Sequence, residues 1–154
     1  MDGFHLRNEV LDARGLRAVK GAPETFDVEG YVTGLRSVRM NPQHTVHWPA
    51  FDRAIEEPVP GAIEIAPATK LVITEGNYLL LDQPGWRDVR PLLDEVWYVD
   101  APPREVLRHR LIERQLAGGR TKEEAMRHVD ESDLANAEQV ARTKTLANRW
   151  IRLS

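Results

Sequence analysis

Two short apolar runs, each followed by an acidic residue, constrain the fold of this chain more than any other feature of its sequence. Residues 71–74 read Leu-Val-Ile-Thr and are followed by Glu75, and residues 95–99 are followed by Asp100. Continuous apolar strands that alternate with helices are typical of a parallel sheet covered on both faces. The sequence therefore predicts an α/β fold with helices on both sides of a mainly parallel sheet.

The other elements are predicted from helix caps, glycines and prolines. We expect helices at residues 9–14, 25–35, 103–116, 121–129 and 133–142, with Thr25 and Asp133 as N-caps and a capping box at Thr121, and a last strand at 149–153. Five prolines between residues 41 and 67 exclude long helices there and leave loops with short extended pieces at 45–48 and 62–65. A chain of 154 residues is expected to form a single domain.

Composition excludes several classes of function. The net charge of -3 gives no basic field for nucleic acid or an anionic membrane, and the lack of cysteine excludes a disulfide scaffold, a thiol nucleophile and a thiolate metal site. No apolar run approaches the ~18 residues of a membrane span, and the first residues do not resemble a signal or transit peptide. We expect a cytoplasmic protein without nucleic acid or membrane partners. Its oligomeric state stays open, with a homodimer among the options.

Two acids lie where an α/β sheet binds its ligands, at the carboxyl ends of strands. Glu75 directly follows the run at residues 71–74, and Asp2 begins the sequence Asp-Gly-Phe-His. A carboxylate in such a place can hold Mg²⁺ or accept a proton from an attacking hydroxyl. The alternative is that either acid only caps a turn, and for Glu75 the two interpretations have equal weight.

Residues 104–120 contain five arginines. On a helical wheel Arg110 and Arg114 lie within roughly 60° of the apolar face that Leu107 and Leu111 define. Taken alone, this favours arginines whose aliphatic stems cover apolar surface. The other interpretation is a lid whose guanidinium groups bind phosphate oxygens.

Four motifs follow one another along the chain. They are Asp2-Gly3-Phe4-His5, Lys20-Gly21-Ala22-Pro23-Glu24-Thr25-Phe26-Asp27, Trp48-Pro49-Ala50-Phe51-Asp52-Arg53 and Val72-Ile73-Thr74-Glu75-Gly76-Asn77-Tyr78-Leu79-Leu80-Leu81. In this order they resemble the bacterial kinases of the uridine kinase, phosphoribulokinase and pantothenate kinase superfamily, and especially its nucleoside or fructose kinase-like branch. The stretch 108–120 is similar to the lid of these kinases. The resemblance covers nearly the whole chain.

The resemblance implies a three-layer fold of the P-loop NTPase type, ATP with Mg²⁺, and phosphoryl transfer to a hydroxyl of a small metabolite. A nucleoside, a pantothenate-like compound and a sugar are the acceptor classes. By position, Asp2 matches the catalytic base or metal-organising acid, and Glu75 the acid near Mg²⁺. Arg110 and Arg114 match phosphate-binding residues of a lid at about residues 104–130. The acceptor pocket is matched by Phe4, His5, Phe51 and Asp52.

The sequence departs from these kinases in one respect. Their phosphate-binding motif Gly-x-x-x-x-Gly-Lys-[Ser/Thr] belongs upstream of the Asp-Gly-Phe-His motif and does not occur in these 154 residues. We therefore expect a kinase domain that is incomplete at its N-terminus, without the first strand, phosphate loop and first helix, and inactive as given. The full-length form would be active. A non-catalytic metabolite-binding protein of kinase descent and an inert fragment are the alternatives.

Overall fold

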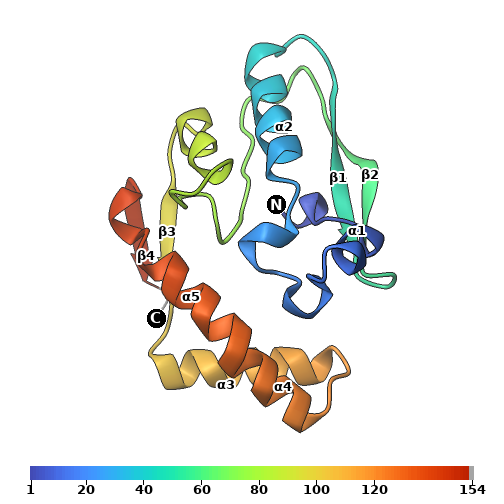
Figure 1. The fold of residues 1–154 in the computed structure, drawn as a ribbon. Helices are drawn as coiled ribbons and strands as arrows, with labels where there is room; N and C mark the ends of the chain where they lie inside the picture. The colour runs from blue at the N-terminus through green and yellow to red at the C-terminus, as the bar shows by residue number, and fades with distance from the viewer. Residues whose placement is uncertain (153–154) are drawn as a thin grey trace. The chain divides into compact units, whose positions relative to one another are not determined.

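The computed structural model describes residues 1–152 (Figure 1). The chain forms two compact units, Met1–Asp94 and Glu95–Ser154, and each is described by itself. The single kinase-like domain predicted for residues 1–154, with its lid region at 104–130, stays a prediction. Within the described residues no helix is both long and apolar enough to cross a membrane.

The first unit combines helices with one β-hairpin. Its α-helices are α1 (Asn8–Ala13) and α2 (Val28–Met40), its strands are β1 (Val46–Asp52) and β2 (Glu57–Ile65), and its short 3₁₀ turns are η1 (Asp2–Phe4), η2 (Arg17–Val19), η3 (Pro23–Thr25), η4 (Trp86–Asp88) and η5 (Arg90–Leu92).

Helix α2 begins after Asp27 rather than after Thr25, so the predicted N-cap is wrong. The Asp27 carboxylate accepts a hydrogen bond from the backbone N–H of Gly30 at 2.9 Å, which satisfies one of the free donors at the helix start. The buried Thr25 hydroxyl instead donates to the carbonyl of Ala22 at 2.7 Å. Thr25 therefore shapes the loop before the helix and does not cap the helix itself.

Strands β1 and β2 form an antiparallel hairpin where loops with short extended pieces were predicted between residues 41 and 67. The extended pieces predicted at 45–48 and 62–65 lie within these strands and pair with each other, from Val46 opposite Ile65 to Trp48 opposite Ile63, but the strands are longer than predicted. Proline has no N–H to donate, and a ribbon of two strands leaves one edge of each strand without a partner, so proline is tolerated there. The register shifts at Pro49, between Trp48 and Ala50.

Aromatic side chains form the core of the first unit. The ring of Phe4 packs edge-on against Tyr31 and Trp48, with centroids 5.1 and 5.4 Å apart, and so ties η1 to α2 and β1. Edge-to-face pairs of this kind are favourable beyond the area they bury. The buried aromatic residues are Phe4, Phe26, Tyr31, Trp48, Tyr78 and Trp86.

The predicted strand at residues 71–74 is not formed. The side chains of Leu71 and Ile73 are 74% and 84% exposed, although both are strongly apolar. A strand needs a hydrogen-bonding neighbour, and no strand among residues 1–152 pairs with this run. One contact fixes its end, since the hydroxyls of Thr74 and Tyr31 lie 2.8 Å apart.

The second unit joins a parallel strand pair to a group of helices. Its elements are β3 (Trp97–Asp100), α3 (Arg104–Ala117), α4 (Lys122–His128), the π-helical turn η6 (Val129–Asp133), α5 (Leu134–Ala141), the 3₁₀ turn η7 (Lys144–Leu146) and β4 (Arg149–Arg152). Strands β3 and β4 are parallel, with Trp97 opposite Arg149, and α5 runs back from α4 toward them (Figure 1). The predicted last strand at 149–153 is present, although residue 153 lies outside the described residues.

The capping box predicted at Thr121 is confirmed. The Thr121 hydroxyl accepts from the backbone N–H of Glu124, and the Glu124 carboxylate accepts from the backbone N–H of Thr121. The N-cap predicted at Asp133 is wrong, because the chain continues in helical conformation from α4 through η6 into α5. A helix that does not start there leaves no free N–H groups for Asp133 to cap.

The α/β class is confirmed, whereas the mainly parallel sheet is not seen in the described residues. They contain one antiparallel hairpin and one parallel pair. The unpaired run at residues 71–74 accounts for this difference, because it was predicted as a strand of that sheet.

Candidate active site

A pocket in the first unit brings together residues from three of the four motifs. Its volume is about 220 Å³, its charged lining residues are Asp2, Arg53 and Glu75, and its aromatic lining residues are Phe4, Trp48 and Phe51. Turn η1, strand β1 and the segment that follows residues 71–74 each contribute to it. Sites for small molecules commonly combine a mainly apolar lining with a few converging polar groups.

The carboxylate of Asp2 is paired with Arg53, whose Nη2 lies 2.9 Å from Asp2 Oδ2. Sequence reasoning missed Arg53, although it is the only cationic residue of its motif and directly follows Asp52. The neighbouring Gly3 allows the close approach of η1 to β1, because a Cβ atom there would lie 1.9 Å from the carbonyl oxygen of Pro49. The glycine therefore positions Asp2 beside the hairpin.

Glu75 lines the same pocket, and its side chain is 81% exposed. Its Oε1 lies 3.4 Å from the backbone nitrogen of Met1. No group of three or more histidine or acidic side chains suited to a metal ion occurs among residues 1–152. Mg²⁺ keeps several waters and is commonly held by one or two carboxylates together with substrate phosphates, so two carboxylates in one pocket fit this mode of binding.

The four residues predicted for the acceptor pocket divide into two pairs. Phe4 and Phe51 line the pocket, whereas His5 and Asp52 do not. The Asp52 carboxylate accepts from the backbone N–H of Ala54 at 2.8 Å and so stabilises the turn after β1.

His5 contacts two residues that line the pocket, Asp2 and Phe51. Its Nδ1 is 2.7 Å from the backbone carbonyl oxygen of Asp2, and its ring centroid lies 4.0 Å from that of Phe26, with the two ring planes tilted by 38°. Burial is the main cause that lowers the pKa of His5 below its usual 6.5, and the nearby Lys20 also lowers it. The neutral imidazole can then donate through Nδ1 to the carbonyl of Asp2.

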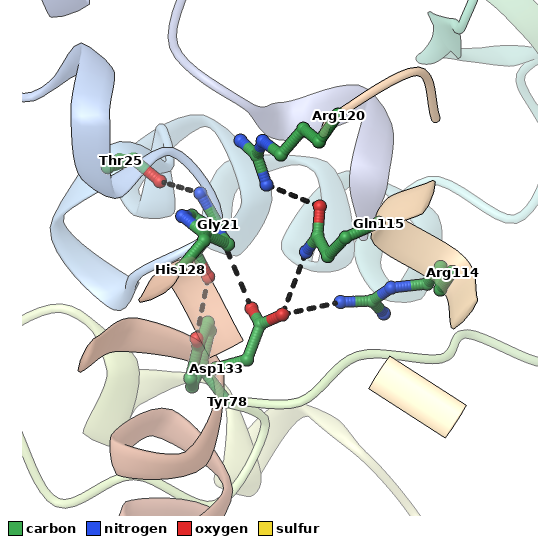
Figure 2. Close-up of polar contacts among 8 residues, drawn as sticks. All are labelled: Gly21, Thr25, Tyr78, Arg114, Gln115, Arg120, His128 and Asp133. Atoms are coloured by element: carbon green, nitrogen blue, oxygen red, sulfur yellow. Dashed lines mark hydrogen bonds and ion pairs between the residues drawn. The ribbon is translucent and has the colours of Figure 1, made fainter. Parts of the chain in front are cut away.

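The second motif, residues 20–27, does not line the pocket but is hydrogen-bonded to other segments of the first unit. The Tyr78 hydroxyl donates to the carbonyl of Gly21 at 2.6 Å, and the Gly21 N–H donates to the Thr25 hydroxyl at 3.0 Å (Figure 2). The adjacent Lys20 donates to the side-chain oxygen of Asn8 at 2.8 Å and to the carbonyl of Glu56 at 2.6 Å. The two Lys20 bonds tie the turn of the β-hairpin to the N-terminal part of the chain, and the Tyr78 bond ties the segment after residue 75 to it.

The two predicted lid arginines lie on α3 in the second unit, and both are exposed. Arg110 forms no hydrogen bond or ion pair within residues 1–152, and Arg114 contacts Asp133 at 3.4 Å. The helical wheel placed both near a buried face, but no residue of α3 is fully buried and Leu107 and Leu111 are only half-buried. The two arginines therefore present their guanidinium groups to solvent.

Comparisons with known proteins show what the chain is similar to. No protein-family model matches it. It is 40% identical over 154 residues to the uncharacterized protein YggC of Escherichia coli, and it spans 62% of that protein's length. It is 35% identical to the ATP-dependent kinase-like protein notR' of Aspergillus versicolor, with 94% of this chain and 88% of the relative covered.

A solved structure agrees with these relatives. The crystal structure described as a "putative fructose transport system kinase" from Silicibacter matches 98% of this chain and 72% of its own, with a TM-score of 0.89 and 40% sequence identity. Identity at this level over most of both chains reflects common descent as well as a common fold. The fold also matches that of the Saccharomyces cerevisiae protein YFH7, described as "a putative P-loop containing kinase", with a TM-score of 0.86 and 24% identity. The resemblance seen in the four motifs is confirmed at the level of the superfamily, and the chain belongs to the P-loop kinase superfamily.

Proposed function

We propose that the full-length form of this protein transfers the γ-phosphoryl group of ATP to a hydroxyl of a small metabolite. One observation carries the proposal: Asp2 and Glu75, from motifs far apart in the sequence, line a single pocket of about 220 Å³. A P-loop kinase needs an acid beside its acceptor and a carboxylate near Mg²⁺. The aromatic lining of Phe4, Trp48 and Phe51 would contact the acceptor's carbon skeleton.

In this proposal Asp2 acts as the general base. The acceptor oxygen forms a bond to the γ-phosphorus, the bond from that phosphorus to the β,γ-bridging oxygen breaks, and the hydroxyl proton passes to the Asp2 carboxylate. Arg53, at 2.9 Å, keeps that carboxylate turned toward the pocket. Glu75 and Asp2 would hold Mg²⁺ through its waters, and the ion would neutralise charge on the phosphates.

In this proposal the two lid arginines add positive charge that, together with Mg²⁺, balances the negative charge of the phosphates. Arg110 and Arg114 are exposed, and Arg114 uses only one guanidinium nitrogen in its contact with Asp133. Their free N–H groups suit the oxygens of a transferring phosphoryl group, whose charge is spread over several atoms. We assign both to phosphate binding, as the motif resemblance implies.

We further propose that the phosphate loop lies in a segment outside these 154 residues and that the 154-residue chain alone is inactive. Three observations support this. The motif Gly-x-x-x-x-Gly-Lys-[Ser/Thr] is absent from the sequence, and the chain spans 62% of YggC, 72% of the Silicibacter kinase and 88% of notR'. In addition, the apolar run at residues 71–74 exposes Leu71 and Ile73, as a strand does when its neighbour is absent.

The test is ATP turnover by the full-length protein with Mg²⁺ and three acceptors: uridine, pantothenate and fructose. We expect one acceptor to release ADP well above the ATP-only rate. Asp2→Asn should lower kcat by at least ~100-fold and leave ATP affinity within a few-fold, because general-base catalysis typically contributes 10²–10⁴-fold.

Asp12→Asn is the matched control, since Asp12 is an exposed acid that pairs with Arg17 at 3.2 Å and does not line the pocket. It should keep wild-type turnover. Near wild-type turnover of Asp2→Asn would sink the assignment of Asp2 as base, and binding of an acceptor without any turnover would favour the metabolite-binding alternative.

A further inference from the structure

A cluster of polar side chains in the second unit surrounds Asp133. Its members, here called the Asp133 cluster, are Arg114, Gln115, Arg120, His128 and Asp133 (Figure 2). Asp133 ends the π-helical turn η6 between α4 and α5. Such turns are rare and occur frequently at functional sites, because the extra residue redirects a side chain.

The Asp133 carboxylate is only 14% exposed and receives three groups. Its Oδ2 accepts from the Gln115 side-chain amide at 2.8 Å and lies 3.4 Å from a terminal nitrogen of Arg114. Its Oδ1 lies 3.7 Å from Nε2 of His128. A carboxylate removed from water in this way is costly unless it is hydrogen-bonded, and Gln115 and Arg114 supply these bonds at Oδ2, whereas His128 lies beyond hydrogen-bond distance of Oδ1.

Gln115 extends the cluster to a second arginine. While its amide nitrogen donates to Asp133, its amide oxygen accepts a hydrogen bond from Arg120. Arg120 directly follows Gly119, whose φ of 90° marks the turn after α3. One carboxylate thus orients Arg114 directly and Arg120 through Gln115.

The negative charge of Asp133 is compensated by the neighbouring arginines and not by His128. Burial is the main cause that lowers the pKa of His128, and the nearby Arg120 and Arg114 lower it further, against the opposite effects of Asp133 and Glu131. A neutral imidazole does not cancel the negative charge of Asp133. The carboxylate can therefore act on the guanidinium groups beside it.

A second ion pair on the same helix shows what a purely structural bond looks like. Arg108 donates from Nε and from Nη2 to the two oxygens of Asp130, both at 2.7 Å. Such a two-pronged bond occupies the fork with which arginine binds an oxyanion. Arg114, by contrast, gives one terminal nitrogen to Asp133 and is 66% exposed, so its other donors stay free.

We propose that Asp133 is a positioning residue of the lid: it orients Arg114, and Arg120 through Gln115, so that their free N–H groups bind the phosphates of ATP. This inference rests on the proposed kinase function. It adds Arg120, Gln115 and Asp133 to the residues on which phosphate binding depends. It also explains why the chain forms a π-helical turn where a regular helix would carry Asp133 to another angle.

The test is binding of Mg²⁺ and the non-hydrolysable analogue AMP-PNP to the full-length protein, measured by calorimetry, with thermal melting of each variant. Asp133→Asn should weaken AMP-PNP binding by about 10-fold, in keeping with the loss of hydrogen bonds to a charged group. Asp130→Asn is the matched control: it breaks the neighbouring ion pair and should leave AMP-PNP affinity within about 2-fold.

A double-mutant cycle separates positioning from general stability. If Asp133 acts through Arg114, Arg114→Ala combined with Asp133→Asn should bind no more than about 3-fold more weakly than Arg114→Ala alone. If Asp133→Asn fails to fold, Gln115→Leu breaks the link to Arg120 without exposing the charge and should still weaken binding by several-fold.

Three results would overturn the proposal. The first is an unchanged AMP-PNP affinity in Asp133→Asn, or in Gln115→Leu if Asp133→Asn does not fold. The second is a double variant in which the losses of affinity from the two substitutions multiply independently. The third is a wild-type protein that does not bind AMP-PNP. Failure of the kinase function looks different, since the wild type would then bind AMP-PNP and respond to Asp133→Asn while turning over none of the three acceptors.

Discussion

Replacing Gly3 by alanine tests the packing that brings Asp2 to the pocket. An ideal Cβ at this position would lie 1.9 Å from the carbonyl oxygen of Pro49, 2.5 Å from its carbonyl carbon and 3.0 Å from the nitrogen of Ala50. Non-bonded atoms pack at about 3.5 Å, so η1 and β1 would have to separate by roughly 1.5 Å. The obstacle is strand backbone, which cannot rotate away as a side chain can.

The expected cost follows from this overlap. Overpacking typically destabilises a protein by about 1–3 kcal/mol, and a clash with strand backbone belongs at the upper end of that range. At about 2–4 °C per kcal/mol for a chain of this size, Gly3→Ala should lower Tm by ~6–12 °C. The turnover of the folded protein should also fall, because the shift separates Asp2 from Arg53.

Gly118→Ala is the matched control for Gly3→Ala. Its Cβ would meet only the carbonyl oxygens of Gln115 at 3.4 Å and Arg114 at 3.6 Å, which is ordinary contact. Its Tm should stay within a few degrees of the wild type, as measured by circular dichroism on the full-length protein. If Gly3→Ala melts like Gly118→Ala and keeps full activity, the close approach of η1 to β1 is not what positions Asp2.

Two further predictions concern stability. His5 and His128 both have a lowered pKa in the fold, so below the usual 6.5 the unfolded chain binds more protons than the folded one. The free energy of unfolding should therefore fall as the pH drops from 7 through 6.5 toward 5, and His5→Gln should flatten this slope in urea titrations. A free energy of unfolding that rises as the pH falls from 7 to 5 would contradict the lowered pKa of the two histidines. Thr121→Ala removes the N-cap of α4 and should cost about 1 kcal/mol, whereas Thr121→Ser should cost little; equal stability of the two variants would count against the capping box.

Local signals in the sequence predicted local structure in part, since the capping box at Thr121 is formed whereas the N-caps expected at Thr25 and Asp133 are not. The Thr121 capping box depends on residues three apart, and those residues alone decide it. Asp2 and Glu75 were predicted as site residues from the rule that ligands bind at strand ends, together with the order of the motifs. Both line one pocket, although the run before Glu75 forms no strand and Asp2 lies in η1, and their catalytic roles stay predictions.

Features that depend on distant partners could not be predicted in this way. The run at residues 71–74 has the composition of a strand, yet it is a strand only when a neighbouring strand pairs with it. The β-hairpin tolerates prolines because it is a ribbon of two strands, which the residues at 41–67 do not reveal. Arg53 and Asp133 were missed or misassigned because their roles come from Asp2 and Arg114, far away in the sequence.

The most direct test of the account is ³¹P nuclear magnetic resonance of a reaction that contains the full-length protein, Mg²⁺, ATP and each acceptor in turn. The account predicts ADP together with a new phosphate-ester signal for one acceptor, and loss of both signals in Asp2→Asn. A full-length protein that carries the Gly-x-x-x-x-Gly-Lys-[Ser/Thr] motif and binds ATP, yet forms no phosphate ester with a nucleoside, a pantothenate-like compound or a sugar, would contradict it.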